Sequence, residues 1–411
     1  MAISSGNTRR RHRTPPLAAW VILILFISLV ICLAVIVNLS RQPNIPSHET
    51  DNSAGGSVLD NSVPDIHAEK PETVSGKSDV TVIATGGTIA GISSGDTDFT
   101  SYTPGIKRID DMIDEISDIR KLANITTQQF ANQNSGSVTT QNLYDLSVAV
   151  DRALETADAV VVTCGTDIME EIAYFLDLTV QSPKPVVVTG SMKPWNVIGS
   201  DAPLNLYNAI KVAASNKTYK CGTVVVLNEE IHAAREVTKS NAVREDTFAT
   251  PMLGMLGYVD DGNVSLYRIP TRAAKSDEDW ATPFDLSKIK ASDIPRVDIV
   301  VSYQGASGEL ITAAVKAGAR GIVTMGTGNG GLTDSLIAAR NQALKQGILV
   351  AATTRTGSGT LYSEDRDGSG LISADNLNAY HARIALQLSL AYSSDYKTIQ
   401  KWFDQYIRIE Y

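Results

Sequence analysis

Two threonine residues follow glycine-rich turns at the ends of apolar, strand-like runs. Thr88 lies in ATGGTIAG, residues 84–91, and Thr166 lies in VTCGTDIMEE, residues 162–171, with Asp167 beside it. The glycines of both turns let the backbone pass close to a ligand. Because a parallel α/β sheet builds its active site at the carboxyl ends of its strands, the two hydroxyls are candidate nucleophiles for acyl transfer.

The same turns also have a purely structural interpretation. A strand–Gly–Gly–helix junction is often only a tight packing turn. In the second turn, Thr166 or Asp167 can cap the helix that follows, with Glu170 and Glu171 interacting favourably with its dipole. Both interpretations can hold for different atoms of one turn.

Lys239, in the sequence REVTKSN at residues 235–241, is a candidate base. A threonine hydroxyl is a poor nucleophile until another group accepts its proton. A lysine kept neutral by burial can accept that proton, although a lone lysine in a polar loop is usually solvated.

Three other functional classes have weaker motifs. The sequence GTGNGG at residues 326–331 follows a strand-like run, but it lacks the G-x-G-x-x-G spacing and no Walker lysine follows. The five histidines form no H-E-x-x-H or comparable ligand spacing, so we predict no metal site. There is also no G-x-S-x-G elbow of an α/β-hydrolase.

The residues from 80 onward alternate strand-like and helix-like runs, which is typical of an α/β fold. Uninterrupted β-branched composition predicts strands covered on both faces. The strands expected in the first part are Val80–Thr85, Ala159–Thr163, Pro185–Thr189 and Thr223–Leu227. The helices expected there are Gln141–Glu155, Met169–Val180 and Leu204–Ser215.

A second α/β run follows a charged, proline-containing stretch at residues 271–295, which we interpret as a linker. We therefore predict a larger N-terminal domain, residues 80–270, and a smaller C-terminal domain, residues 296–411. The strands expected in the second domain are Val297–Tyr303, Gly321–Met325 and Ile348–Thr353. The helices expected there are Leu310–Ala317, Asp334–Gln346, His381–Tyr392 and Tyr396–Tyr406.

The first 79 residues do not have the composition of a globular domain. No charged residue occurs at 17–39, and about 20 apolar residues suffice to span a bilayer. A secretory signal usually has an apolar core of only about 7–15 residues, so we predict an uncleaved signal-anchor, with a cleaved signal as the alternative. Arginines at 9–13 place the tail at 1–16 in the cytoplasm and the catalytic part outside, in an extracellular or periplasmic space. Residues 40–79 are rich in Pro, Ser, Gly and Asp and are expected to be a disordered stalk.

The charge balance argues against a nucleic-acid partner. Residues 1–79 hold equal numbers of basic and acidic side chains, so the whole formal net charge of −9 belongs to residues 80–411. The chain has 3 cysteines, and one of them lies in the apolar segment. The folded part is therefore not a disulfide scaffold.

Three motifs together identify a family. ATGGTIAG, TCGTDIMEEIAYFLDLTV and VTGSMKPWNVIGSDAPLNLYNAI occur in this order, with VTKSN downstream. In these motifs the chain resembles the bacterial-type L-asparaginase family, close to its type II secreted branch. The resemblance covers residues 80–411. It implies a hydrolase that converts asparagine to aspartate and ammonia without a cofactor.

The resemblance also implies roles for single residues. Thr88 matches the nucleophile, and Tyr102, in SYTPGI, matches the tyrosine of a mobile loop that assists it. Thr166, Asp167 and Lys239 match the second triad. Asp167 would also hold the substrate's α-amino group, and Ser135 would contact its α-carboxylate. Backbone N–H groups of the glycine-rich turns would serve as oxyanion donors.

The family's working unit is a homotetramer of intimate dimers in which each site borrows an acidic residue from a neighbouring chain. That acid maps to Glu364, with Asp365 as the rival because the loop spacing differs. Ser191 and Met192 occupy the place where the family makes backbone contacts to the substrate amide.

The chain departs from the family at several positions near the site. Cys164 stands where histidine is common, and Gly136 and Gly305 stand where longer or polar side chains are common. Ser137 and Val138 replace the usual Asp and Met. These departures bear on side-chain preference and not on the reaction type. The alternatives to an asparaginase are a broader glutaminase-asparaginase and a catalytically silent amino-acid-binding protein.

Overall fold

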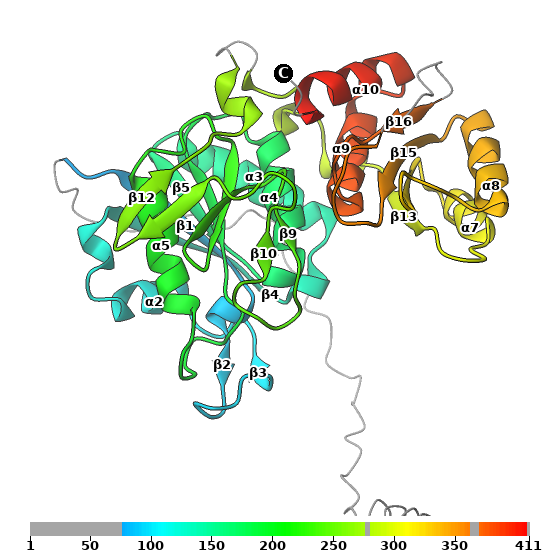
Figure 1. Cartoon of the computed structure of the whole chain (residues 1–411). Helices are drawn as coiled ribbons and strands as arrows, with labels where there is room; N and C mark the ends of the chain where they lie inside the picture. The colour runs from blue at the N-terminus through cyan, green and yellow to red at the C-terminus, as the bar shows by residue number, and fades with distance from the viewer. Residues whose placement is uncertain (1–75, 276–279, 362–369, 409–411) are drawn as a thin grey trace, which may run out of the picture. The chain divides into compact units, whose positions relative to one another are not determined.

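Two sheets flanked by helices make up most of the residues that the computed structural model describes, 76–275, 280–361 and 370–408 (Figure 1). All of these residues belong to one unit of the chain. The larger sheet comes first in the sequence and the smaller sheet comes second, which confirms the predicted two-domain α/β class.

The larger sheet has eight strands in the order β12-β11-β8-β7-β6-β5-β1-β4. Its strands are β1 (Asp79–Gly86), β4 (Asn124–Gln133), β5 (Ala159–Thr163), β6 (Val186–Thr189), β7 (Thr223–Leu227), β8 (Glu230–Ala233), β11 (Gly257–Asp260) and β12 (Asn263–Leu266). The strands from β4 to β7 pair in parallel, and β8, β11 and β12 extend the sheet antiparallel.

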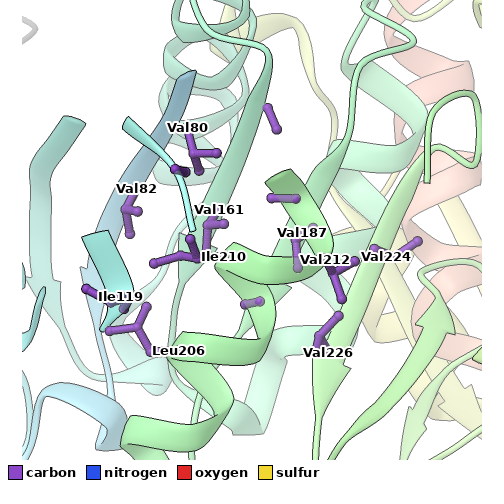
Figure 2. Close-up of a cluster of buried hydrophobic side chains, with 14 of the residues drawn as sticks. Val80, Val82, Ile119, Val161, Val187, Leu206, Ile210, Val212, Val224 and Val226 are labelled. Carbon is purple, nitrogen blue, oxygen red and sulfur yellow. The ribbon is translucent and has the colours of Figure 1, made fainter. Parts of the chain in front are cut away.

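Helices cover both faces of this sheet. They are α2 (Ile109–Glu115), α3 (Thr140–Leu154), α4 (Met169–Thr179) and α5 (Ala202–Ala214). Alternate residues of a strand point to opposite faces, and both faces carry valines. Val161, with its neighbours on β1, β6 and β7, packs against α5 (Figure 2), whereas Val160 and Val162 pack against residues of α3 and α4. The run of valines is explained by this two-sided burial.

The smaller sheet is entirely parallel, in the order β13-β14-β15-β16. Its strands are β13 (Val297–Val301), β14 (Gly321–Gly326), β15 (Leu349–Thr354) and β16 (Leu371–Ser373). Its helices are α7 (Glu309–Lys316), α8 (Asp334–Lys345), α9 (Ala379–Tyr392) and α10 (Tyr396–Trp402), and α10 continues as a π-helical turn, Phe403–Ile407. Helix α9 contacts three strands of this sheet and also α4 of the first domain.

Two antiparallel hairpins stand apart from the large sheets. Strand β2 (Ile92–Ser93) pairs with β3 (Tyr102–Thr103), and β9 (Thr238–Lys239) pairs with β10 (Phe248–Ala249). Each hairpin carries one candidate site residue, Tyr102 on β3 and Lys239 on β9. The positions of these two side chains therefore depend on short, local pairings.

The stretch predicted as a linker is packed where the structure describes it. Phe284 and Leu286 are buried in the core that α9 and the smaller sheet share. The Arg272 guanidinium lies over the Trp280 ring, 3.9 Å from its centroid. This connection is therefore part of the structure that holds the two sheets together.

Within the described ranges, no helix combines the length and the apolarity needed to cross a membrane. The predicted tail at 1–16, the predicted span at 17–39 and nearly all of the predicted stalk at 40–79 lie outside those ranges.

Candidate active site

Three neighbouring strands end at the same edge of the large sheet, and each is followed by a candidate residue. Strands β4 and β5 lie on opposite sides of β1, although β5 is the next strand of this sheet after β4 in the sequence. Ala84 of β1 pairs with Thr163 of β5, so the turns after both strands leave the sheet together. Such a reversal of strand order is where open α/β sheets bind ligands. Ser135 follows β4, Thr88 follows β1 and Thr166 follows β5.

Glycines let these three turns touch. Gly87 has φ +83°, a conformation that favours glycine, and a Cβ on it would overlap the backbone nitrogen of Gly165. A Cβ on Gly165 would in turn overlap the hydroxyl oxygen of Ser135. The close approach of the first two turns therefore requires glycine at position 87, and a side chain at position 165 would displace the Ser135 hydroxyl.

Thr88 is paired with Tyr102. Their hydroxyl oxygens are 2.6 Å apart, and either can donate. The tyrosine ring packs against Gly91, where a Cβ would lie 2.7 Å from its Cδ2 atom. Strand β3, which carries Tyr102, is positioned by pairing with Ser93 of β2. The tyrosine hydroxyl is thus directed at the Thr88 hydroxyl.

Thr166 is paired with Lys239. The lysine Nζ donates to Thr166 Oγ1 at 2.9 Å and to Asp167 Oδ1 at 2.7 Å. Thr166 is buried, and the Lys239 side chain is 13% exposed, whereas the Asp167 side chain is 73% exposed. The inner hydroxyl is therefore shielded, while the carboxylate stays open to a ligand's ammonium group.

An open depression of about 450 Å³ adjoins the Lys239–Asp167 pair. Asn241 and Tyr380 also border it, and neither candidate threonine does. It gives the outer side of the ion pair access to solvent.

The second turn can also be interpreted as a helix cap from its sequence, but the structure shows no side-chain cap at the start of α4. Helix α4 begins at Met169, and no side chain caps it at Ile168. Thr166 lies in the 3-10 turn before the helix, and its hydroxyl faces Lys239. The threonine and its acidic neighbour are therefore directed toward the lysine.

Glu170 lies beside the candidate site, although the sequence predicted for it only a favourable interaction with the helix dipole. Its buried carboxyl group accepts hydrogen bonds from the backbone N–H of Lys239 and from the side chain of Asn378 in the C-terminal domain. Asn378 lies 208 positions further along the chain. No local sequence pattern signals a contact across that distance.

Ser191 and Met192 follow β6, and each makes a hydrogen bond to a nearby residue of the same chain. The Ser191 hydroxyl donates to the Lys193 carbonyl oxygen at 2.6 Å, and the Met192 N–H donates to Asp201 Oδ2 at 2.9 Å. The Gly87 N–H likewise donates to the Gln133 carbonyl oxygen at 3.1 Å. These two N–H groups are thus already engaged and are not the ones to bind a substrate oxygen.

The departures from the family pattern have clear structural settings. Cys164 is fully buried, and desolvation raises the pKa of its thiol, so it is not a nucleophile at neutral pH. A Cβ on Gly136 or on Gly305 would meet nothing within 4 Å in this chain. Both positions therefore leave open space where the family often has a side chain.

The glycine-rich loop at 326–331 is closed on itself. The backbones of Thr327 and Gly331 bond to each other in both directions, at 2.9 and 2.6 Å. The helix that follows, α8, is capped by the Thr333 hydroxyl, which accepts from the Leu336 N–H. The N–H groups of Thr327, Gly331 and Leu336 are therefore already engaged. Glu364 and Asp365, the candidates for the borrowed acid, lie outside the described ranges.

Two family models match the chain. One, described as Asparaginase, N-terminal, matches residues 79–272, and the other, described as Glutaminase/Asparaginase C-terminal domain, matches residues 296–403.

Named relatives agree with these matches. The chain is 38% identical over 330 residues to L-asparaginase 2 of Bacillus subtilis, which covers 80% of this chain and 86% of the relative. It is 32% identical over 345 residues to a glutaminase-asparaginase of Pseudomonas fluorescens, covering 82% and 93%. A solved structure of a probable cytoplasmic L-asparaginase from Campylobacter jejuni is similar with a TM-score of 0.75 and 37% identity, covering 80% of this chain and 100% of that one.

Proposed function

Because the chain belongs to the asparaginase family, we propose that it is an amidohydrolase that converts L-asparagine to L-aspartate and ammonia through a covalent acyl-threonine intermediate. The observation that carries the proposal is the pair of threonine hydroxyls at adjacent strand ends. One is hydrogen-bonded to Tyr102 and the other to Lys239. Two hydroxyls with separate partners suit a reaction in two steps.

In the first step, Thr88 Oγ1 attacks the carboxamide carbon of the substrate. Tyr102 accepts the hydroxyl proton through the existing 2.6 Å contact while its own phenolic proton passes to the departing nitrogen. The C–N bond breaks, the nitrogen leaves as ammonia, and the acyl group stays on Thr88 as an ester. In the second step, water cleaves this ester and releases aspartate. The proton of this water passes to Thr88 Oγ1 as the ester bond breaks, and we assign the Thr166 hydroxyl, held by Lys239, as the relay for it.

The substrate's charged end is held by residues around the same turns. Asp167 is exposed and can bind an ammonium group, and Ser135 lies against Gly165 with its hydroxyl toward the second turn. Holding the substrate at both of these groups would place its carboxamide near Thr88. Orientation of this kind can contribute several kcal/mol, about 7–11 in favourable cases.

A broader glutaminase-asparaginase is the second candidate, since one relative carries that name. The open space at Gly136 leaves fewer side-chain contacts to exclude a longer substrate. One extra methylene is worth only about 1–3 kcal/mol of discrimination. We therefore expect asparagine to be preferred with measurable turnover of glutamine.

The site is proposed to be completed by a second copy of the chain in a homotetramer of intimate dimers. In the described part of the chain Thr88 and Tyr102 are only half-buried and Asp167 is exposed, which leaves room for a second copy to cover the substrate. Mixing the inactive variants Thr88→Val and Glu364→Ala would test the sharing. A hybrid dimer would have one intact site, so activity should partly return. A fully active Glu364→Ala variant would remove Glu364 from this role and make Asp365 the next candidate.

The location is proposed from the sequence that precedes the sheets. Arginines at 9–13 and the uncharged segment 17–39 favour a membrane-anchored enzyme of the type II branch, with its catalytic part extracellular or periplasmic, or a protein secreted after cleavage. Protease added to intact cells should cut within residues 40–79 and release an active fragment. Recovery of all activity in the cytosol would contradict this location.

Ammonia release by the purified full chain tests the function itself. L-asparagine and L-glutamine are assayed separately, with the Thr88→Val variant as the blank. We expect release from asparagine that exceeds release from glutamine. A folded wild-type chain that releases no ammonia from either amide would contradict the proposed function.

A further inference from the structure

The buried carboxyl group of Glu170 joins the candidate lysine to the C-terminal domain. Its Oε1 atom accepts the backbone N–H of Lys239 at 3.4 Å, and the Thr238 side chain also donates to this carboxyl group. Its Oε2 atom accepts Nδ2 of Asn378 at 2.9 Å. The Glu170 side chain is 7% exposed, so these hydrogen bonds replace water around the carboxyl group.

The side-chain amide of Asn378 can face Glu170 in only one orientation. Its Oδ1 atom accepts the His381 N–H at 2.8 Å and so caps the start of α9. The amide nitrogen must then be the atom that faces Glu170. Donor and acceptor are thus assigned on both sides of the contact.

The neighbouring imidazole does not supply a positive charge. His381 is 1% exposed, and burial together with the Arg235 charge lowers the pKa of His381 to about 3. Its Nδ1 atom lies 3.0 Å from the carbonyl oxygen of Arg235, which can only accept, so Nδ1 carries the ring hydrogen. Burial also raises the pKa of Glu170, and hydrogen bonds from Thr238, Lys239 and Asn378 oppose this rise. Directional hydrogen bonds, and not an ion pair, therefore hold the carboxyl group.

Lys239 needs contacts beyond its own strand to hold its position, because strand β9 is short. Strand β9 contains only Thr238 and Lys239, and it pairs with a strand of equal length. Glu170, in contrast, projects from α4, whose neighbouring residues Met169 and Ile172 are buried in the core. The carboxyl group thus connects a short, half-buried strand to two rigid helices.

We propose that Glu170 is a positioning residue for Lys239: by binding the backbone of β9 on one side and Asn378 on the other, it fixes the lysine Nζ at hydrogen-bonding distance from Thr166. This inference rests on the proposed function of the same site. Other contacts also tie the domains together, such as Arg383 with Glu171 at 3.6 Å, but that pair does not involve β9.

An exchange of donor and acceptor tests the link. Glu170→Gln places an amide nitrogen opposite the Asn378 nitrogen, and Asn378→Asp places two carboxylates opposite each other. With both changes, the glutamine nitrogen can donate to the new aspartate, and an aspartate still caps α9. Glu171→Gln, one position along the same helix, is the matched control.

We expect each single variant to lower kcat for asparagine by about tenfold or more, since displacements of about 1 Å can cost up to ~10²-fold. The KM should change little, and the double variant should recover most of the kcat. The rate at which Lys239 is acetylated by acetic anhydride, read by peptide mass spectrometry, provides a second measurement that does not depend on turnover. It should rise in the single variants and return in the double variant.

Three results would overturn the inference. In the first, the single variants keep the wild-type kcat and the wild-type acetylation rate of Lys239. In the second, the single variants lose thermal stability and nothing else. In the third, the double variant recovers neither kcat nor the acetylation rate. A wild-type chain without ammonia release would instead speak against the proposed function, while the acetylation rates would still decide the role of Glu170.

Discussion

The backbone of Gly87 lies so close to the backbone of Gly165 that Gly87 could not carry a side chain: a Cβ on Gly87 would lie 2.3 Å from the Gly165 nitrogen. This contact joins the turns after β1 and β5 into one site. It places Thr88 and Thr166 at the same sheet edge, each with its own partner. Two hydroxyls with separate partners are the basis of the first prediction.

Both threonines are expected to be essential for turnover. Thr88→Val or Thr166→Val keeps the shape of the side chain and removes the hydroxyl, so kcat should fall by orders of magnitude, about 10³-fold or more. The free energy of unfolding should stay within about 1–2 kcal/mol of the wild-type value. Ammonia release and urea denaturation measure the two quantities.

Thr163→Val is the matched control for this pair. Thr163 lies on β5, and in the described part of the chain its buried hydroxyl oxygen has no hydrogen-bond partner. Removing an unsatisfied buried hydroxyl is nearly neutral or stabilising, so this variant should remain active and folded. Near-normal turnover by either catalytic variant would remove that threonine from the mechanism.

We expect turnover to depend on the position of the Tyr102 hydroxyl relative to the Thr88 hydroxyl. Gly91 has an ordinary extended backbone that alanine can adopt, but the Cβ of Gly91→Ala would lie 2.7 Å from the tyrosine ring and 2.9 Å from the Thr88 carbonyl oxygen, so the contact between Tyr102 and Thr88 must shift. We expect this small change to lower kcat by about tenfold or more, because displacing a catalytic group by about 1 Å is costly. Tyr102→Phe, which removes the hydroxyl, should lower kcat at least as much.

Gly95→Ala serves as the control for Gly91, because a Cβ at Gly95 would meet nothing within 4 Å. It should behave as wild type in steady-state kinetics. If Gly91→Ala kept full activity with the ring visibly displaced in a crystal structure, Tyr102 would not be needed at this position.

A partly buried carboxyl group on α3, that of Asp151, should make stability depend on pH. Burial raises the pKa of Asp151 to about 6, although the Gln181 N–H donates to it at 3.0 Å. In the unfolded chain an aspartate releases its proton near pH 4. Between these values the native state binds more protons, so the free energy of unfolding falls as pH rises toward 6. Asp151→Asn should therefore stabilise the protein at pH 7.5 and have little effect at pH 4.

Melting temperatures of the wild type and of Asp151→Asn at the two pH values measure this difference. An equal difference at both values would show that the Asp151 carboxyl group does not titrate in the expected range.

Strands rich in valine could be predicted from the sequence because they are buried on both faces, and Thr223–Leu227 and Ala159–Thr163 match β7 and β5 at both ends. Strand β4, NITTQQFANQ, was missed. It lies at the edge of the sheet and is mostly half-buried, so it has neither an apolar run nor a clean alternation. The short antiparallel strands β8, β11 and β12 were missed because pairing, and not composition, defines them.

Candidate site residues could be proposed from the sequence where they lie inside a motif. Thr88, Thr166 and Asp167 could be assigned from their turns, and Lys239 from the resemblance. The same reasoning assigned Glu170 only to the helix dipole, because its partners belong to β9 and to the start of α9. Contacts that depend on the packing of two domains leave no local pattern in a sequence.

Partitioning of the acyl group between water and hydroxylamine tests the central claim most directly. If Thr88 carries an aspartyl ester, added hydroxylamine will compete with water for it, and the wild-type chain will form aspartyl hydroxamate while it continues to release ammonia from asparagine. The hydroxamate should replace aspartate in proportion to the hydroxylamine concentration, and Thr88→Val should form neither product. Continued ammonia release with aspartate as the sole product at every hydroxylamine concentration would mean that water attacks the amide directly, and it would contradict the acyl-threonine mechanism.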